Sequence, residues 1–224
     1  MFDPQIWRVA VEEKGFEREP VVIVDSFAER PQALIEQAAR LSFGVTTLYY
    51  PGIRAELPGD VSAALMEALG PLCERVFDVS PSLESSCYSL VTTPAAQLAP
   101  IQRLPHYDGM EPRRLALILY LCDPRLGGTS FYRHRSTGFE TVTRDRFISY
   151  RDALAGDVRR HGLPPAAYHV GDTPLFERIA VPAPVFNRAL IYRGRNLHSG
   201  DITPDFAFDP DPRTGRLTLT GFMI

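Results

Sequence analysis

Lysine and cysteine, two chemically versatile residues, are scarce in this chain of 224 residues. Lys14 is the only lysine and stands in a run of charged residues, which argues against catalysis through a lysine Schiff base. The three cysteines, Cys73, Cys87 and Cys122, lie far apart and form neither a CxxC pair nor a zinc-ribbon spacing. We therefore expect reduced, buried thiols in a cytosolic protein.

Signals for secretion, membrane insertion and nucleic-acid binding are also missing. The first residues contain neither the basic nor the apolar segment of a secretion signal, which favours a cytoplasmic location. The longest strongly apolar run, residues 115–122, is far too short to span a bilayer. With 24 basic and 27 acidic residues the net charge is only -3, which gives no electrostatic basis for a nucleic-acid or membrane partner.

The remaining composition is that of an ordinary globular protein. Hydrophobic residues make up 45% of the chain and charged residues 23%, enough for one large domain with a real core. The 20 prolines and 16 glycines are scattered, which is typical of many short strands joined by loops. Because no repeat and no linker interrupts the chain, we expect a single domain over residues 1–224.

The first part of the chain, about residues 1–84, is predicted to supply supporting helices after one short strand at residues 21–25. Ser26 to Glu29 has the spacing of a capping box, and Pro31 suits a first helical turn, so a helix is expected from there to about residue 41. Apolar residues repeat every three or four positions over residues 61–77, which predicts a second amphipathic helix.

The β-rich core is expected in the second part, about residues 85–224, where short apolar or alternating runs predominate. Strands are predicted at residues 87–92, 114–122, 128–132, 185–192, 196–200 and 215–224. A helical pattern at residues 144–161 lies within an insertion of about residues 133–182. Helices first and strands afterwards predict a mainly β barrel or sandwich backed by helices, not an alternating βαβ fold.

Three residues could form a metal centre. In an extended segment His106 and Asp108 point to the same side, so both can reach one metal while Tyr107 points away. A hydrophobic strand and a tight Arg-Gly-Arg turn then deliver His198 to a barrel interior. Two histidines and one carboxylate form the facial triad of non-haem Fe(II) oxygenases. The alternatives are a surface histidine beside an aspartate, and a half-buried histidine bonded to a backbone carbonyl.

The last predicted strand places Arg216 and Thr218 on one face, because Leu217 and Leu219 alternate with them. A buried guanidinium requires an anion, and a dicarboxylate would bind its fork of N–H groups while Thr218 donates a further hydrogen bond. The alternative is an edge strand with Arg216 in solvent.

In this order, the HxD motif, the distal histidine after a strand and the Arg-x-Thr strand resemble the Fe(II)/2-oxoglutarate-dependent dioxygenases, in particular the prolyl-hydroxylase-like branch and its bacterial relatives. The turn and strand at residues 127–131 are similar to the GG-containing strand of that family. The resemblance covers residues 85–224 and implies a double-stranded β-helix, also called a jelly roll or cupin-like fold.

The resemblance also implies the roles of six residues. His106, Asp108 and His198 would bind the catalytic iron. Arg216 and Thr218 would bind the distal carboxylate of the cosubstrate 2-oxoglutarate, and Tyr88 would contact the same molecule.

The activity that the resemblance implies is oxidation by O2 with release of succinate and CO2, such as hydroxylation of a small molecule or a peptide side chain, with ascorbate as an accessory reductant. The insertion would lie over the mouth of the active site. Two other functions stay open: a cupin-like metalloenzyme that does not use 2-oxoglutarate, and a jelly-roll binding module without catalysis. The oligomeric state is open as well, a homodimer included.

Three other histidines compete as ligands. His134 lies between two arginines, which disfavours a metal cation, and His161 and His169 flank a proline-rich loop where we expect them to be exposed.

Overall fold

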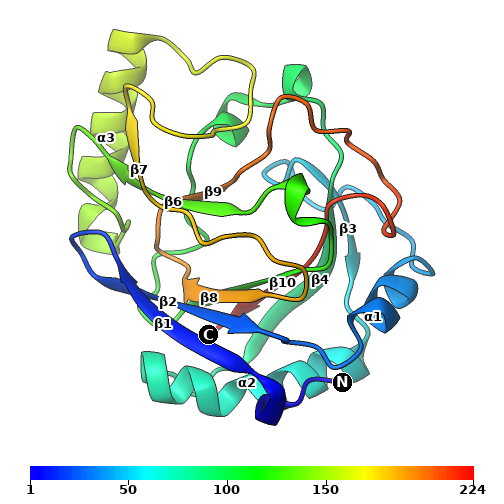
Figure 1. Ribbon diagram of the computed structural model, residues 1–224. Coiled ribbons are helices and arrows are strands. Elements are labelled where there is room, and N and C mark those ends of the chain that lie inside the picture. Colours follow the sequence, from blue (N-terminus) through cyan, green and yellow to red (C-terminus); the bar gives the residue numbers. More distant parts are fainter.

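The computed structural model describes residues 1–224 as two antiparallel β-sheets with three α-helices (Figure 1). The large sheet has seven strands in the order β1-β2-β8-β5-β10-β4-β3, and the small sheet has three in the order β7-β6-β9. The strands are β1 (Arg8–Lys14), β2 (Glu19–Asp25), β3 (Gly52–Glu56), β4 (Leu83–Val91), β5 (Leu115–Tyr120), β6 (Thr129–His134), β7 (Phe176–Ala180), β8 (Ala189–Arg193), β9 (His198–Gly200) and β10 (Leu217–Met223).

The chain winds back and forth between the two sheets. After β4 in the large sheet, His106 forms a bridge with His198 at the edge of the small sheet, and β5 returns to the large sheet. The strands β6 and β7 then pair in the small sheet, and β8, β9 and β10 alternate between the two. This winding is that of a double-stranded β-helix, so the predicted fold class is confirmed.

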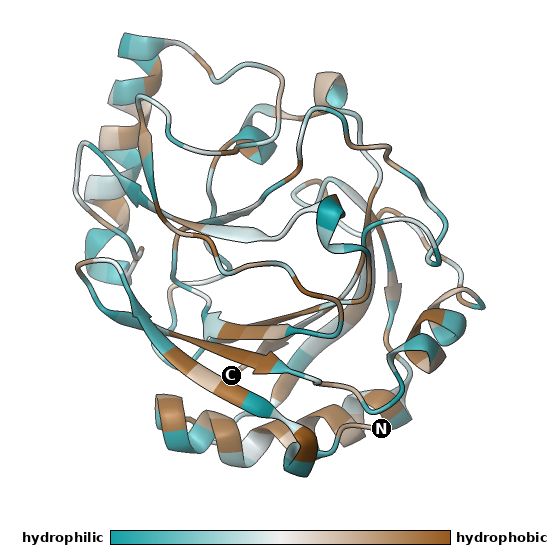
Figure 2. Ribbon diagram, in the orientation of Figure 1, coloured by the Kyte–Doolittle hydropathy of each residue, from teal (hydrophilic) through white to brown (hydrophobic).

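Two helices, α1 (Pro31–Ala38) and α2 (Gly59–Phe77), cover the outer face of the large sheet (Figure 1). The main core of 27 buried residues lies between these helices and the large sheet. It includes Leu65 and Leu69 of α2 and Leu217 and Leu219 of β10. Each fully buried leucine of this kind contributes roughly 1.5–3 kcal/mol. Figure 2 shows the hydrophobic colour along the neighbouring strands β2 and β8 of this sheet. The outer face of the large sheet is therefore the main source of stability.

The inner face of the large sheet packs against the small sheet through a second, smaller core. This core contains eight buried residues, among them Tyr120, Phe131 and Tyr192. The third helix, α3 (Arg144–His161), covers the other side of the small sheet, where Tyr150 packs with Tyr132 and Phe176. Helix α3 lies along the side of the molecule and not over the centre of the large sheet (Figure 1).

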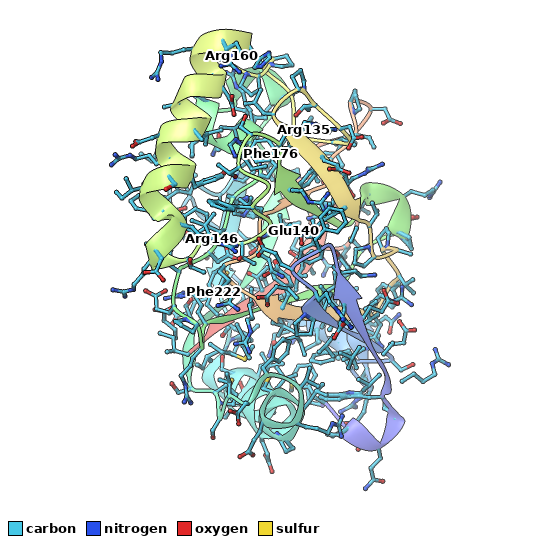
Figure 3. All side chains as sticks on the ribbon, turned by 90° about the vertical axis from the view of Figure 1, so that its left-hand side faces the viewer. Arg135, Glu140, Arg146, Arg160, Phe176 and Phe222 are labelled. Carbon is cyan, nitrogen blue, oxygen red and sulfur yellow. The ribbon has the colours of Figure 1, made fainter.

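A buried carboxylate fastens the β1–β2 turn to the small sheet. Glu140 accepts hydrogen bonds from the backbone N–H groups of Phe16 and Glu17 at 2.9 and 3.0 Å, and from Arg133 Nε at 2.8 Å. Arg146 of α3 donates to Glu17 at 2.6 Å. Figure 3 shows Glu140 and Arg146 close to each other near the start of α3. These ion pairs and hydrogen bonds join the β1–β2 turn, the small sheet and α3, so the charged groups have a structural role.

The structure differs from the sequence prediction mainly before residue 84. Helix α1 begins at Pro31, as expected, but its N-cap is Arg30 without a side-chain hydrogen bond, and the helix ends at Ala38. Ser26 has a positive φ of 57°, so it lies in a turn and caps nothing. This part of the chain is also more than a helical support, because β1, β2 and β3 extend the large sheet at both edges.

The short helical segments are 3-10 turns at Pro4–Ile6, Ala95–Gln97, Pro100–Arg103 and Pro124–Leu126. None of the helices has the length and apolar character needed to cross a membrane.

Candidate metal centre

The structure brings His106, Asp108 and His198 together at one end of the small sheet. The two histidines face each other in an antiparallel bridge, in which each backbone N–H donates to the carbonyl of the other at 2.9 and 2.8 Å. One donor atom from each of the three side chains lies within 4.8 Å of the others, and they are the only such group of His, Cys, Asp and Glu in the molecule. Asp108 Oδ2 is 3.3 Å from His198 Nε2, and Asp108 Oδ1 is 3.9 Å from His106 Nε2.

The local backbone explains why these side chains converge. His106 and Asp108 are two residues apart in extended chain, and Asp108 N–H donates to Gly194 O at 2.6 Å. Tyr107 points the other way, with its ring 6.3 Å from the ring of Tyr150 on α3. Gly194 lets the chain pass close to these groups, because a Cβ there would lie 3.5 Å from Asp108 Cβ and 3.0 Å from an Arg114 carbon.

A hydrogen bond fixes the orientation of the His198 ring. Its Nδ1–H donates to Asn196 O at 2.8 Å, and a carbonyl can only accept, so the tautomer follows. The other nitrogen, Nε2, is thereby left as a lone-pair donor that faces Asp108. Metal-binding histidines are oriented by this kind of second hydrogen bond.

The electrostatics of the three groups suit a divalent cation. Burial raises the pKa of Asp108, and the positive charges of Arg54 and Arg114 only partly oppose it. A bound dication favours both the ionised carboxylate and the neutral imidazole.

The exposure of the three side chains leaves one side of the group open. The His106 side chain is 51% exposed, whereas those of Asp108 and His198 are 14% and 6% exposed. Two imidazoles and one carboxylate with open positions are the donor set typical of non-haem Fe(II). The residues therefore fit that metal by number, type and access.

Arg216 lies inside the molecule, as the alternation of the last strand predicts. It immediately precedes β10, which runs between β4 and β5 in the middle of the large sheet. Arg216 is 4% exposed, and it donates from Nη2 to Gly128 O at 2.8 Å and from Nε to Gly127 O at 3.2 Å. A Cβ on Gly200, two residues after His198, would lie 3.9 Å from Arg216 Nη2. The guanidinium thus reaches the strand that carries the second histidine.

The segment between His198 and Arg216 packs through Ile202 and Phe206 on Val91 of β4. Arg213 holds it to α1 by donating to Glu36 at 3.0 and 2.8 Å. Thr218 follows as a fully buried residue on the same face as Arg216, while Leu217 and Leu219 point into the helix-covered core.

Tyr88 is not brought to this site, and this corrects the role that the resemblance implies for it. Its ring is part of the core beneath the helices, and its hydroxyl donates to Gln37 Oε1 of α1 at 2.8 Å. Successive residues of a strand point to opposite faces, so Ser89, not Tyr88, shares the inner face with Thr218.

Three residues of the inner face were not found from the sequence. Tyr120 lies in the buried run of β5 and donates to Thr129 Oγ1 at 2.9 Å. Arg54 and Tyr50 come from β3 and the loop before it, and the Arg54 guanidinium lies 4.0 Å above the centre of the Tyr50 ring. The alternation Ile53-Arg54-Ala55 is the one signal that could have placed Arg54 inside, because it repeats the pattern of Arg216 in a shorter form.

The three competing histidines lie elsewhere. His134 is fully buried with Nε2 3.2 Å from Asp157 of α3, which makes it a link between helix and sheet. His161 is exposed at the end of α3. His169 is only 4% exposed and packs on Tyr132 and Phe176, so the expectation that it is exposed is wrong.

The fold defines a class of protein, the double-stranded β-helix proteins. One solved structure with this fold is that of the non-haem α-ketoglutarate-dependent epimerase SnoN from nogalamycin biosynthesis. It has 13% identity and a TM-score of 0.55, with 93% of this chain and 79% of that chain covered. HygX from Streptomyces hygroscopicus, solved with nickel and 2-oxoglutarate, has 12% identity and a TM-score of 0.51, with 93% and 84% of the two chains covered. AviO1 from Streptomyces viridochromogenes Tue57 has 13% identity and a TM-score of 0.51, with 93% and 90% covered. At these identities the likeness shows the fold, and it confirms the resemblance at that level.

The chain itself belongs to a family of unknown function, DUF6445, whose sequence profile it matches over residues 5–223. No curated protein matches the sequence.

Proposed function

We propose that this protein is a non-haem Fe(II)- and 2-oxoglutarate-dependent oxygenase. One observation carries the proposal: two imidazoles and a carboxylate converge within 4.8 Å at one end of the sandwich, and a buried arginine of the neighbouring sheet reaches the same strand as His198. The cluster of three side chains alone, or the buried arginine alone, could have a purely structural role. Together they provide a metal site and an anion site in one interior, which is what a metal-chelating dicarboxylate needs.

His106, Asp108 and His198 would hold the iron, which when bound supplies the activation of O2 that couples oxidation of 2-oxoglutarate to succinate and CO2 with hydroxylation of a substrate. Asn196 keeps His198 in the metal-binding tautomer through its carbonyl. The backbone bridge between the two histidines holds their main chains side by side before any ligand arrives.

Arg216 and Thr218 would bind the distal carboxylate of 2-oxoglutarate. Two nitrogens of Arg216 already donate to carbonyls, which fixes the plane of the guanidinium and leaves Nη1 for an anion. A charge-assisted bond of this type contributes about 1.5–3 kcal/mol. We further propose a small-molecule or peptide substrate, ascorbate as an accessory reductant and a cytoplasmic location.

The proposal is tested by succinate formation from 2-oxoglutarate with Fe(II), ascorbate and O2. We expect succinate from the wild type, none from Asp108→Ala, and a sharply raised 2-oxoglutarate requirement in Arg216→Gln. Arg151→Gln, which removes an exposed arginine of α3 that pairs with Asp152, serves as the matched control and should behave as wild type.

Two outcomes would redirect the assignment. Bound iron without any succinate would indicate a cupin-like metalloenzyme with another cosubstrate. No bound metal, and no effect of His106→Ala on metal content, would indicate a binding module.

A further inference from the structure

The inner face carries a second arginine that neither the metal ligands nor Arg216 accounts for. Arg54 lies on β3, where it is paired in register with Ser89 of β4, and Ser89 is paired with Thr218 of β10. Its neighbour Ile53 packs into the helix-covered core, so Arg54 points to the opposite, inner face.

The other arginines around the metal centre already have partners. Arg114, next to Asp108, donates to Glu84 at 2.5 and 2.7 Å and to Glu111 at 3.4 Å. Arg216 donates to two backbone carbonyls. The Arg54 side chain forms no hydrogen bond and no ion pair with the protein, and its Nε is buried without a partner. Leaving a buried N–H donor such as this one unpaired costs roughly 1–3 kcal/mol.

A second orphaned group lies beside it. The Tyr50 hydroxyl is buried without a hydrogen-bond partner, while the Tyr50 ring supports the Arg54 guanidinium at 4.0 Å. Burial raises the pKa of Tyr50 to about 12, so the hydroxyl keeps its proton and can act as a donor. Arg54 and Tyr50 therefore offer N–H and O–H donors that the protein does not use.

The charges of the site indicate what these donors bind. Fe(II), Arg54 and Arg216 bring positive charge, and Asp108 and the two carboxylates of 2-oxoglutarate bring negative charge, which leaves a single net positive charge. One further carboxylate neutralises it, whereas a phosphate dianion reverses it. Arg216 is deeply buried, whereas Arg54 lies on an edge strand and is partly exposed. Arg216 therefore suits the cosubstrate, and Arg54 suits a substrate that binds after it.

We propose that Arg54, together with the Tyr50 hydroxyl, binds a carboxylate of the primary substrate, which is therefore a small carboxylic acid. This inference rests on the proposed function, because it takes Arg216 as the group that binds 2-oxoglutarate. The planar fork of Arg54 suits a carboxylate, and the stacked Tyr50 ring restricts the guanidinium to one plane.

The test measures binding by calorimetry to the Ni(II)-loaded protein, which avoids turnover. First, 2-oxoglutarate is titrated into the wild type, Arg54→Gln, Arg216→Gln and the control Arg151→Gln. We expect Arg216→Gln to weaken 2-oxoglutarate binding by at least about tenfold, the loss of one charge-assisted bond. Arg54→Gln should change it by less than about twofold.

Second, with 2-oxoglutarate saturating, the probes are acetate, benzoate and N-acetylglycine, each beside its primary amide, and inorganic phosphate. We expect at least one carboxylate to bind the wild type about tenfold or more tightly than its amide, and Arg54→Gln to remove this preference. Arg54→Lys should keep part of it, and Tyr50→Phe should weaken carboxylate binding by about threefold to tenfold, the value of one hydrogen bond. Thermal unfolding of each variant identifies any that does not fold, and Arg54→Lys and Tyr50→Phe then carry the test.

The inference is overturned if the wild type shows no preference for carboxylates, if Arg54→Gln retains that preference, or if phosphate is the preferred anion. It is also overturned if Arg54→Gln loses as much affinity for 2-oxoglutarate as Arg216→Gln does. In each of these cases Ni(II) and 2-oxoglutarate still bind, so the proposed function stands. Failure of the wild type to bind them removes the proposed function instead.

Discussion

The two faces of the large sheet are built from the same strands and differ in almost everything else. On β10, Leu217 and Leu219 enter the core beneath α1 and α2, whereas Thr218 points to the interior that holds the histidines. On β4, Tyr88 is covered by the helices and Ser89 lies opposite Thr218. The outer face determines whether the chain folds, and the inner face determines what the folded chain binds.

The difference teaches where polar groups are tolerated in this molecule. The outer face holds almost only apolar side chains, and its one phenol, Tyr88, is satisfied by Gln37. The inner face contains Arg54 Nε and the Tyr50 hydroxyl without partners, although burial of such groups is unfavourable. Unsatisfied polar groups gathered on one face of a stable sheet are what a ligand site requires.

The largest effect on the inner face is expected from a substitution at the metal centre. We expect Asp108→Ala to abolish iron binding, because it removes both a ligand atom and the only negative charge among the three ligands. Metal content after gel filtration gives the result, and Asp152→Ala, an exposed carboxylate of α3, is the control. Stoichiometric iron in Asp108→Ala would sink the assignment of the triad.

A substitution on the outer face should lower stability and leave iron binding unchanged. Leu219→Ala leaves a cavity in the main core and should lower the free energy of unfolding by about 2–5 kcal/mol. The folded fraction should bind iron as the wild type does. Urea unfolding with parallel metal analysis measures both, and a loss of iron without a loss of stability would contradict the division between the faces.

Thr218→Val, one position away, sharpens the same contrast. The two side chains have nearly the same shape, so the substitution removes a hydroxyl from the inner face with little change in packing. We expect 2-oxoglutarate to bind about threefold to tenfold more weakly, the value of one hydrogen bond, with stability changed by about 1 kcal/mol or less. Unaltered 2-oxoglutarate affinity in calorimetry would remove Thr218 from the site.

Tyr88→Phe should have the smallest effect. It breaks the hydrogen bond to Gln37 and should cost about 1 kcal/mol of stability. The affinity for 2-oxoglutarate should not change, because Tyr88 faces the helices. If affinity falls as in Thr218→Val, Tyr88 contacts the cosubstrate and its placement on the outer face is incorrect.

Features with a strong local pattern could be predicted from the sequence. The alternation after Gly215 places Arg216 and Thr218 inside, and the spacing of His106 and Asp108 places both on one side of the chain. The amphipathic repeat of α2 gives its length to within two residues, residues 61–77 against Gly59–Phe77.

Features that depend on tertiary context could not be predicted. Strand β1 is exposed and rich in charge, so no hydrophobic pattern marks it. Arg54 lies in a five-residue strand, too short for its weak alternation to identify the inner face without the pairing to β4. The choice between Tyr88 and Ser89 for the inner face depends on the register of β4 with β10, which a single strand does not reveal.

The central claim, that the three metal ligands and Arg216 form one site, is tested most directly by the dependence of 2-oxoglutarate binding on metal. Calorimetry of 2-oxoglutarate is carried out with the metal-free and the Ni(II)-loaded wild type. We expect metal to tighten binding at least about tenfold, and, because linkage is reciprocal, 2-oxoglutarate to tighten Ni(II) binding by the same factor. Equal affinity of 2-oxoglutarate for the metal-free and the metal-loaded protein would contradict a shared site.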